Sequence, residues 1–138
     1  MTDVDARAPT ARRRVAALVA MIAAMALGLA SRHWPGIAPA AFGKYPGDAL
    51  WALMVSFAWY ALRPRARSTV VGACALATCV AVEVAKLWQA PWLVAFRHTN
   101  FGHLLLGHVV SWQNLVAYGA GVLVGVAVDR LILRRFAA

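Results

Sequence analysis

Between Ser68 and Leu87 the chain reads STVVGACALATCVAVEVAKL, the stretch that decides the fold class. Its side chains are mostly small or aliphatic, and Glu83 and Lys86 are its only charged residues. As an α-helix, a stretch of this length extends about 30 Å, which matches the hydrocarbon core of a bilayer. The stretch therefore predicts a transmembrane helix.

Three further apolar runs flank this stretch, and each is long enough for most of a membrane crossing. They cover Val15–Ala30, Ala49–Leu62 and Leu115–Val128. We therefore expect an all-α integral membrane bundle of four transmembrane helices. Residues 12–138 would form this single domain, after a disordered cytoplasmic tail at residues 1–11, which are largely small or polar.

The run Val15–Ala30 also has a second interpretation. A basic flank precedes it, and the small residues Gly28 and Ala30 resemble the cleavage site of a signal peptide. The run is longer than a usual signal-peptide core, so we favour a retained helix. Cleavage would leave three spans.

Composition supports the membrane interpretation. Hydrophobic residues make up 62% of the 138-residue chain. Charged residues make up only 14%, well below the charged fraction of a typical soluble domain. The net charge of +9 sits in short clusters between the apolar runs. This placement is typical of membrane topology and contact with anionic lipid, and it argues against nucleic-acid binding. Cys74 and Cys79 lie inside an apolar run without metal or redox spacing, which indicates packing residues.

The basic residues also predict the orientation. With four spans, one side of the membrane carries ten Lys and Arg residues and the other side four. The ten are Arg7, Arg12, Arg13, Arg14, Arg63, Arg65, Arg67, Arg130, Arg134 and Arg135; the four are Arg32, Lys44, Lys86 and Arg97. Because cytoplasmic loops are enriched in positive charge, both chain ends are predicted to be cytoplasmic.

Two connections lie on the predicted outer side. The segment Trp34–Pro46 contains several Pro and Gly residues and is expected to be a loop. The segment Pro91–Gln113 is too polar for a lipid-exposed span. We expect it to form a short interfacial or re-entrant piece before the last helix.

Glu83 is the most informative single residue. An ionisable group inside a span is costly unless it is paired, so Glu83 should face the interior of the bundle. Lys86 lies three residues later on the same helix face and is a natural partner. A structural ion pair and a functional site both remain open.

Other polar and aromatic residues gather on the same predicted side. Asp48 could belong to a binding site or could cap the second helix. Arg97 could hold an anionic headgroup or pair with Glu83 or Asp48. The full set of candidate ligand-binding residues is Asp48, Trp51, Glu83, Lys86, Arg97, His103, His108, Trp112 and Asn114. No residue is assigned a catalytic role.

The two histidines of this set do not suggest a metal site. His103 and His108 are five residues apart, about 140° around an ideal helix, whereas helical zinc sites usually use a spacing of four. No phosphate-binding glycine loop is visible either. We therefore expect neither a metal nor another cofactor.

Several of these residues belong to a longer pattern. It comprises YPGDALW (Tyr45–Trp51), EVAK (Glu83–Lys86), PWL (91–93) with Arg97, FGHLLLG (Phe101–Gly107) and WQNLVAYGAG (Trp112–Gly121). The pattern resembles the small bacterial membrane proteins of the family named domain of unknown function 2809, or DUF2809, which are similar in turn to the VanZ-like family. The resemblance implies four helices in a bacterial inner membrane and no established activity. VanZ-like proteins are linked to glycopeptide resistance, which implies a cell-envelope precursor or lipid as ligand by analogy.

The chain departs from the expected family pattern at two positions. Asn114 stands where we expect Asp, which weakens any role of this residue as an acid, base or metal ligand. Lys86 stands where we expect Gln, which supplies a partner for Glu83.

The leading functional hypothesis is a non-catalytic protein that binds a lipid or envelope precursor in an outward-facing polar pocket. One alternative is an enzyme for a lipid-linked substrate, with Glu83 and Asp48 as acid and base. Another is a small transporter or a subunit of a larger complex. Gly121 and Gly125 have GxxxG spacing, which suggests a homo-oligomer through that face.

Overall fold

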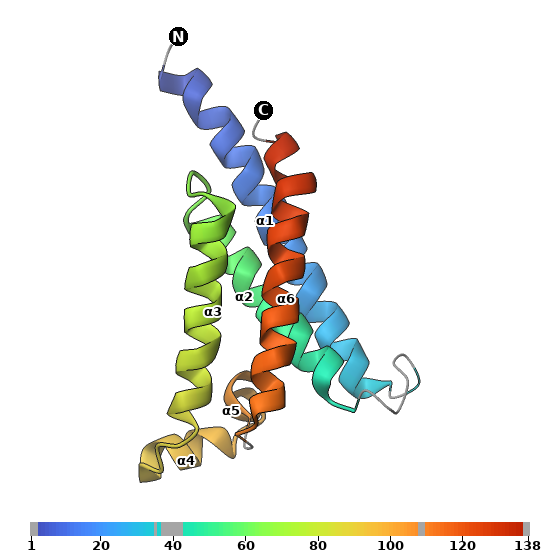
Figure 1. Cartoon of the computed structure of the whole chain (residues 1–138), viewed down its shortest axis with the longest axis vertical. Helices are drawn as coiled ribbons and strands as arrows, with labels where there is room; N and C mark the ends of the chain where they lie inside the picture. The colour runs from blue at the N-terminus through green and yellow to red at the C-terminus, as the bar shows by residue number, and fades with distance from the viewer. Residues whose placement is uncertain (1–2, 35, 37–42, 108–109, 137–138) are drawn as a thin grey trace.

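The computed structural model describes residues 3–34, 36, 43–107 and 110–136, which are all-α. Its helices are α1 (Asp3–His33), α2 (Tyr45–Leu62), α3 (Ser68–Ala85), α4 (Pro91–Arg97), α5 (Asn100–Leu106), α6 (Trp112–Leu131) and the short 3-10 helix η3 (Leu133–Phe136). Figure 1 shows the start of α1 and the end of α6 at one end of the molecule, called here the terminal end. The short helices α4 and α5 lie at the opposite end, called the connecting end.

Three helical segments of the described chain are long and apolar enough to cross a membrane: Ala8–His33, Ser68–Ala85 and Trp112–Phe136. They indicate a multi-pass membrane protein, as the sequence predicted. The fourth expected span, α2, is not among them. Its first turn is formed by Tyr45, Pro46, Gly47 and Asp48, which lower the hydropathy of an otherwise apolar helix.

Several boundaries differ from the sequence prediction. α1 begins at Asp3, so residues 3–11, expected as a disordered tail, are helical. α2 begins at Tyr45 rather than Ala49, because Pro46 fits the first helical turn, where its missing N–H costs nothing. Asp48 consequently lies inside the first turn, and Lys44 occupies the N-cap. The prediction that Asp48 could cap the second helix was thus wrong.

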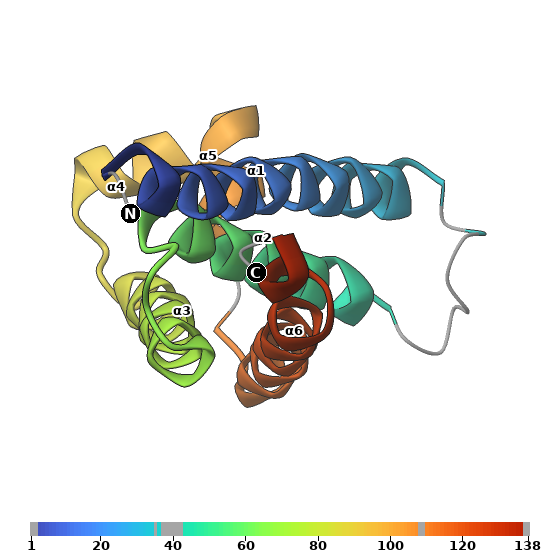
Figure 2. The same cartoon turned by 90° about the horizontal axis from the view of Figure 1, so that it is seen from above.

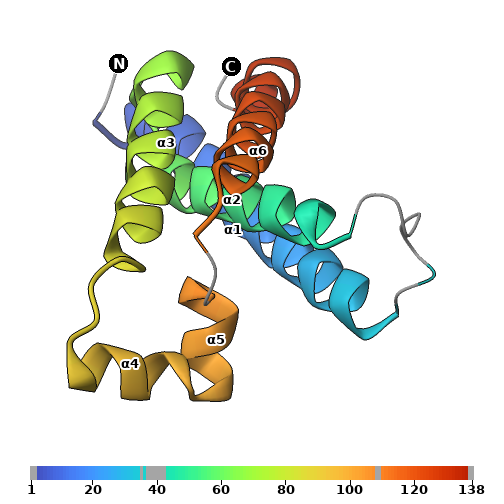
Figure 3. The ribbon, with the colours of Figure 1, turned by 60° about the horizontal axis from the view of Figure 1, so that its bottom comes forward.

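The segment expected to be interfacial or re-entrant consists of two short helices. α4 begins at a proline, and α5 begins after Thr99, whose hydroxyl oxygen accepts a hydrogen bond from Gly102 N at 3.0 Å. A Cβ on Gly102 would overlap the Phe96 carbonyl oxygen, so only glycine allows α5 to approach α4 this closely. Figure 3 shows α4 lying across the connecting end and α5 turning back from it.

α2 is the central helix of the bundle. Viewed from above in Figure 2, it lies between α1 on one side and the pair α3 and α6 on the other, and it contacts all three. A Cβ on Gly121 would overlap the Ala49 carbonyl oxygen, and one on Gly125 would lie 2.8 Å from Ser56 Cβ. The GxxxG spacing therefore serves close packing of α6 on α2 within the chain. A homo-oligomer stays a prediction and would need another face of α6.

The terminal end is held by a buried ion pair that sequence reasoning missed. The Nη2 atom of Arg13 lies 2.7 and 2.8 Å from the two carboxylate oxygens of Asp129. Ser68 Oγ donates to the same carboxylate at 2.6 Å, and Tyr60 donates to the Ser68 carbonyl at 3.3 Å. This network joins α1, α2, α3 and α6, and Asp129 is 0% exposed.

Candidate functional site

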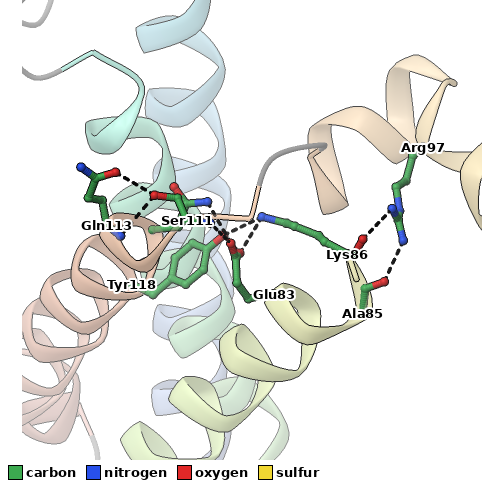
Figure 4. A network of polar contacts seen from close by, with 8 residues as sticks. Glu83, Ala85, Lys86, Arg97, Ser111, Gln113 and Tyr118 are labelled. Atoms are coloured by element: carbon green, nitrogen blue, oxygen red, sulfur yellow. Dashed lines mark hydrogen bonds and ion pairs between the residues drawn. The ribbon is translucent and has the colours of Figure 1, made fainter. Parts of the chain in front are cut away.

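The connecting end contains a second buried network, centred on the Glu83 carboxylate (Figure 4). Oε2 accepts hydrogen bonds from Lys86 Nζ at 2.6 Å and Tyr118 Oη at 3.1 Å. Oε1 accepts from the Ser111 backbone N–H at 2.9 Å and from Asn114 Nδ2 at 3.1 Å. We call these five residues the Glu83 network. Four donors within the protein thus satisfy the buried carboxylate.

Helical periodicity explains how the network assembles. Glu83 and Lys86 lie one turn apart at the end of α3, and Asn114 and Tyr118 lie one turn apart at the start of α6. Ser111 is the N-cap of α6, and its hydroxyl accepts from Gln113 N at 3.3 Å. We predicted that Glu83 faces the interior of the bundle and contacts Lys86, Arg97 or a polar group of the connection before the last helix. Burial and the contacts with Lys86 and Ser111 confirm this, whereas Arg97 is not a partner.

Arg97 has a different position from the one expected. Its guanidinium donates to the carbonyl oxygens of Ala85 at 2.7 Å, Lys86 at 3.0 Å and Trp88 at 2.6 Å. These carbonyls belong to the end of α3 and the turn that follows, where the helix itself supplies no donors. Arg97 is 4% exposed and therefore caps α3 from α4. Pairing with Glu83 or Asp48 was wrong, because both Nη atoms bond these carbonyl oxygens; the buried Nε has no acceptor among the described residues.

A cavity of about 410 Å³, called here the polar cavity, opens beside the Glu83 network. The end of α1, the start of α2, the end of α3, α5 and the start of α6 all contribute to it. Its lining residues are Ser31, Arg32, Gly43, Lys44, Pro46, Gly47, Asp48, Lys86, His103, Gly107 and Asn114. Among these described lining residues, three have cationic side chains, Arg32, Lys44 and Lys86, and one, Asp48, has a carboxylate. Among the described residues, no donor reaches the Oδ2 atom of Asp48.

A second, apolar hollow adjoins the polar cavity and is called here the apolar groove. Its volume is about 110 Å³, and it runs between α1, α2 and α5. Its lining residues are Ala24, Met25, Gly28, Leu29, Arg32, Gly47, Leu50, Trp51, Met54, Phe101, Leu104 and Leu105. Arg32 and Gly47 line both hollows, so the two meet at these residues.

The structure divides the candidate residues into groups. Asp48, Lys86, His103 and Asn114 line the polar cavity, and Glu83 lies behind Lys86 and Asn114. Trp51 lines the apolar groove, and its ring centroid lies 5.5 Å from that of Tyr118.

Three candidates lie elsewhere or cannot be placed. Trp112 is 71% exposed and lines neither hollow, because it is the first residue of α6 and points outward. Arg97 lies behind the cavity at the end of α3. His108 lies outside the described residues.

Sequence reasoning missed Arg32 and Lys44 of the polar cavity and Ser111 and Tyr118 of the Glu83 network. Arg32 and Lys44 were counted only as charges of the outer side, although their shared side with Lys86 was a usable signal. Tyr118 follows Asn114 by one helical turn, which could have placed it on the same face. Within the described chain, no three His, Cys, Asp or Glu side chains come together as a metal site.

These features define the class of protein: an all-α, multi-pass membrane protein with a cationic cavity beside a buried acidic residue. A family model described as "Protein of unknown function (DUF2809)" matches residues 37–122. The match covers more than half of the chain, so this protein belongs to the DUF2809 family. No solved structure matches the fold.

Proposed function

We propose that this chain is a non-catalytic protein of the bacterial inner membrane that binds a lipid or cell-envelope precursor in the polar cavity. The observation that carries the proposal is the meeting of Arg32, Lys44 and Lys86 at a cavity that continues into the apolar groove. Cationic side chains attract an anionic headgroup, and an apolar surface beside them suits a hydrocarbon chain. An amphiphilic ligand would satisfy both surfaces at once.

The proposed topology has four membrane passes with both chain ends in the cytoplasm. α1 and α3 both start at the terminal end, and α6 returns to it (Figure 1). The chain must therefore travel back between α1 and α3, and α2 covers that path. The ten basic residues of the terminal side support a cytoplasmic terminal end by the positive-inside rule. The polar cavity then opens toward the outer side.

The enzymatic alternative loses its acid–base pair. Glu83 accepts four hydrogen bonds within the protein and does not line the polar cavity, so it is poorly placed to exchange protons with a ligand. Asp48 alone lines the cavity as a carboxylate. Binding without chemistry is the function that this arrangement supports best. The link to the cell envelope rests on the resemblance to VanZ-like proteins.

Lipid that co-purifies with the protein provides the test. We would extract the parent protein in mild detergent and quantify bound lipid by native mass spectrometry. The double variant Arg32→Gln/Lys44→Gln should lose most of the bound anionic lipid, because it removes two exposed cavity cations. The matched control is Arg14→Gln/Arg65→Gln, two exposed arginines of an open basic hollow at the other end. Equal loss in both double variants would contradict a specific site in the polar cavity.

A further inference from the structure

We propose that the ligand is a phosphatidylglycerol-type lipid, with a singly charged phosphodiester and hydroxyl groups in the polar cavity and the first methylenes of one acyl chain in the apolar groove. This inference rests on the proposed function and deepens it. Three observations support it: the continuity of the two hollows, the charge balance of the cavity and the carboxylate of Asp48.

The continuity of the two hollows requires a ligand with a polar and an apolar part. Arg32 and Gly47 line both hollows. The Arg32 guanidinium lies close to the start of α2, since a Cβ added to Gly47 would be 3.4 Å from Arg32 Nε. A phosphate held by Arg32 therefore sits at the junction. A chain attached to that phosphate can continue along Leu50 and Trp51 of α2.

The apolar groove is built for a hydrocarbon chain and not for a polar group. Apart from Arg32 at its junction with the polar cavity, its lining residues are apolar. Met25, Leu29 and Phe101 on its rim are 44%, 41% and 66% exposed. In a membrane protein these side chains face lipid, so a chain can enter sideways from the bilayer. Burial of its methylenes along the groove would add affinity.

Charge balance points to an anion with a single charge. Lys86 is already paired with the buried Glu83 carboxylate at 2.6 Å. The remaining cations are Arg32 and Lys44, opposed by Asp48. With histidine counted as neutral, the cavity and the Glu83 network together hold one net positive charge. A phosphodiester carries one negative charge, whereas a phosphomonoester carries up to two.

The Asp48 carboxylate indicates what else the headgroup carries. Asp48 lines the cavity, and its Oδ2 atom is buried without a donor among the described residues. A carboxylate beside a bound phosphodiester would be repelled unless the headgroup also supplies a donor to it. The hydroxyl groups of a glycerol headgroup supply such donors without a second charge. An ammonium headgroup would also donate, but it would cancel the negative charge of the ligand.

Defined lipids and matched variants test the inference. Delipidated protein in detergent would be titrated separately with phosphatidylglycerol, phosphatidylethanolamine, polyprenyl monophosphate and inorganic phosphate, with bound species counted by native mass spectrometry. We expect phosphatidylglycerol to bind at least tenfold more tightly than phosphatidylethanolamine. Arg32→Gln and Lys44→Gln should each weaken its binding by on the order of tenfold. Both side chains are exposed, so these variants should fold.

The chain part of the proposal has its own variant pair. Leu105→Trp places a bulky ring in the groove at a side chain that is 38% exposed, and should weaken phosphatidylglycerol binding several-fold. Leu123→Trp, on the 70% exposed surface of α6, is the matched control and should bind as the parent does. Equal effects of the two variants would overturn the assignment of the groove.

The remaining outcomes separate this inference from the proposed function. Tightest binding of polyprenyl monophosphate or phosphatidylethanolamine, still lost in Arg32→Gln and Lys44→Gln, would overturn the phosphatidylglycerol assignment and leave the proposed function standing. Inorganic phosphate that displaces phosphatidylglycerol at equal concentration would show that no chain contributes, and would overturn it as well. Lipid binding that does not respond to Arg32 or Lys44 would refute both.

Discussion

The Oε2 atom of Glu83 lies 2.6 Å from Nζ of Lys86, which follows it by one turn as the C-cap residue of α3, and both side chains are only 5% exposed. Because the pair is buried, removing one charge leaves the other unpaired in the interior. We predict that Glu83→Gln and Lys86→Met each lower stability. The double variant should show a coupling of about 0.5–3 kcal/mol. Unfolding in detergent measures it.

The control for this pair is Lys44→Met, which removes a lysine that is exposed to solvent. Combined with Glu83→Gln it should give an additive result. Additivity of Glu83→Gln with Lys86→Met would contradict a structural ion pair.

Arg97 is predicted to act on stability and not on lipid binding. Its fork reaches three carbonyl oxygens beyond the end of α3, and lysine cannot reproduce that geometry. Arg97→Lys should therefore lower the thermal unfolding temperature although the charge is kept, and Arg65→Lys, at an exposed arginine, should not. The further stabilisation by added anionic lipid should be equal in the parent and in Arg97→Ala. Loss of that lipid-induced stabilisation in Arg97→Ala would contradict this prediction and would indicate that Arg97 binds the lipid.

The contact between α6 and α2 predicts different effects on stability for alanine substitutions at Gly121 and Gly119. Gly121→Ala should destabilise the fold by about 1–3 kcal/mol, because its Cβ would overlap the Ala49 carbonyl oxygen. Gly119→Ala, two residues earlier, would meet nothing within 4 Å and should be neutral or slightly stabilising. Thermal unfolding of the two variants side by side is the measurement. Equal effects would mean that α6 does not pack on α2 through Gly121.

The proposed topology rests on the basic residues and on the antiparallel path of α2. Reporter fusions after Arg67 and after Ala138 should both report the cytoplasm, and a reporter inserted at Lys44 should report the outer side. A cytoplasmic signal at Lys44 would contradict the four-pass arrangement and would place the polar cavity on the wrong side for an outer-leaflet lipid.

Local periodicity made part of this structure predictable from the sequence. The apolar run from Ser68 gave α3, and the spacing of Glu83 and Lys86 on one helix face gave their ion pair. Both depend only on residues that are close in the chain. The helical repeat alone brings them together.

Contacts between distant residues could not be predicted in the same way. Arg13 and Asp129 are 116 positions apart, and nothing local in either segment distinguishes a buried ion pair from a flanking charge. Arg32 and Lys86 meet at one cavity only because α1 and α3 end on the same side of the bundle. Arg97 was assigned to the site because of its charge. Its guanidinium instead donates to backbone carbonyl oxygens at the end of α3 and in the following turn. Such competition between partners is decided by packing.

An experimental structure in a nanodisc of bacterial lipids would test the central claim most directly. The account predicts headgroup density in the polar cavity within hydrogen-bond distance of Arg32 and Lys44, continuous with chain density along Trp51 in the apolar groove. It also predicts that Glu83 keeps its four protein donors and does not touch the lipid. A cavity occupied only by water, with ordered lipid confined to the terminal end, would contradict it.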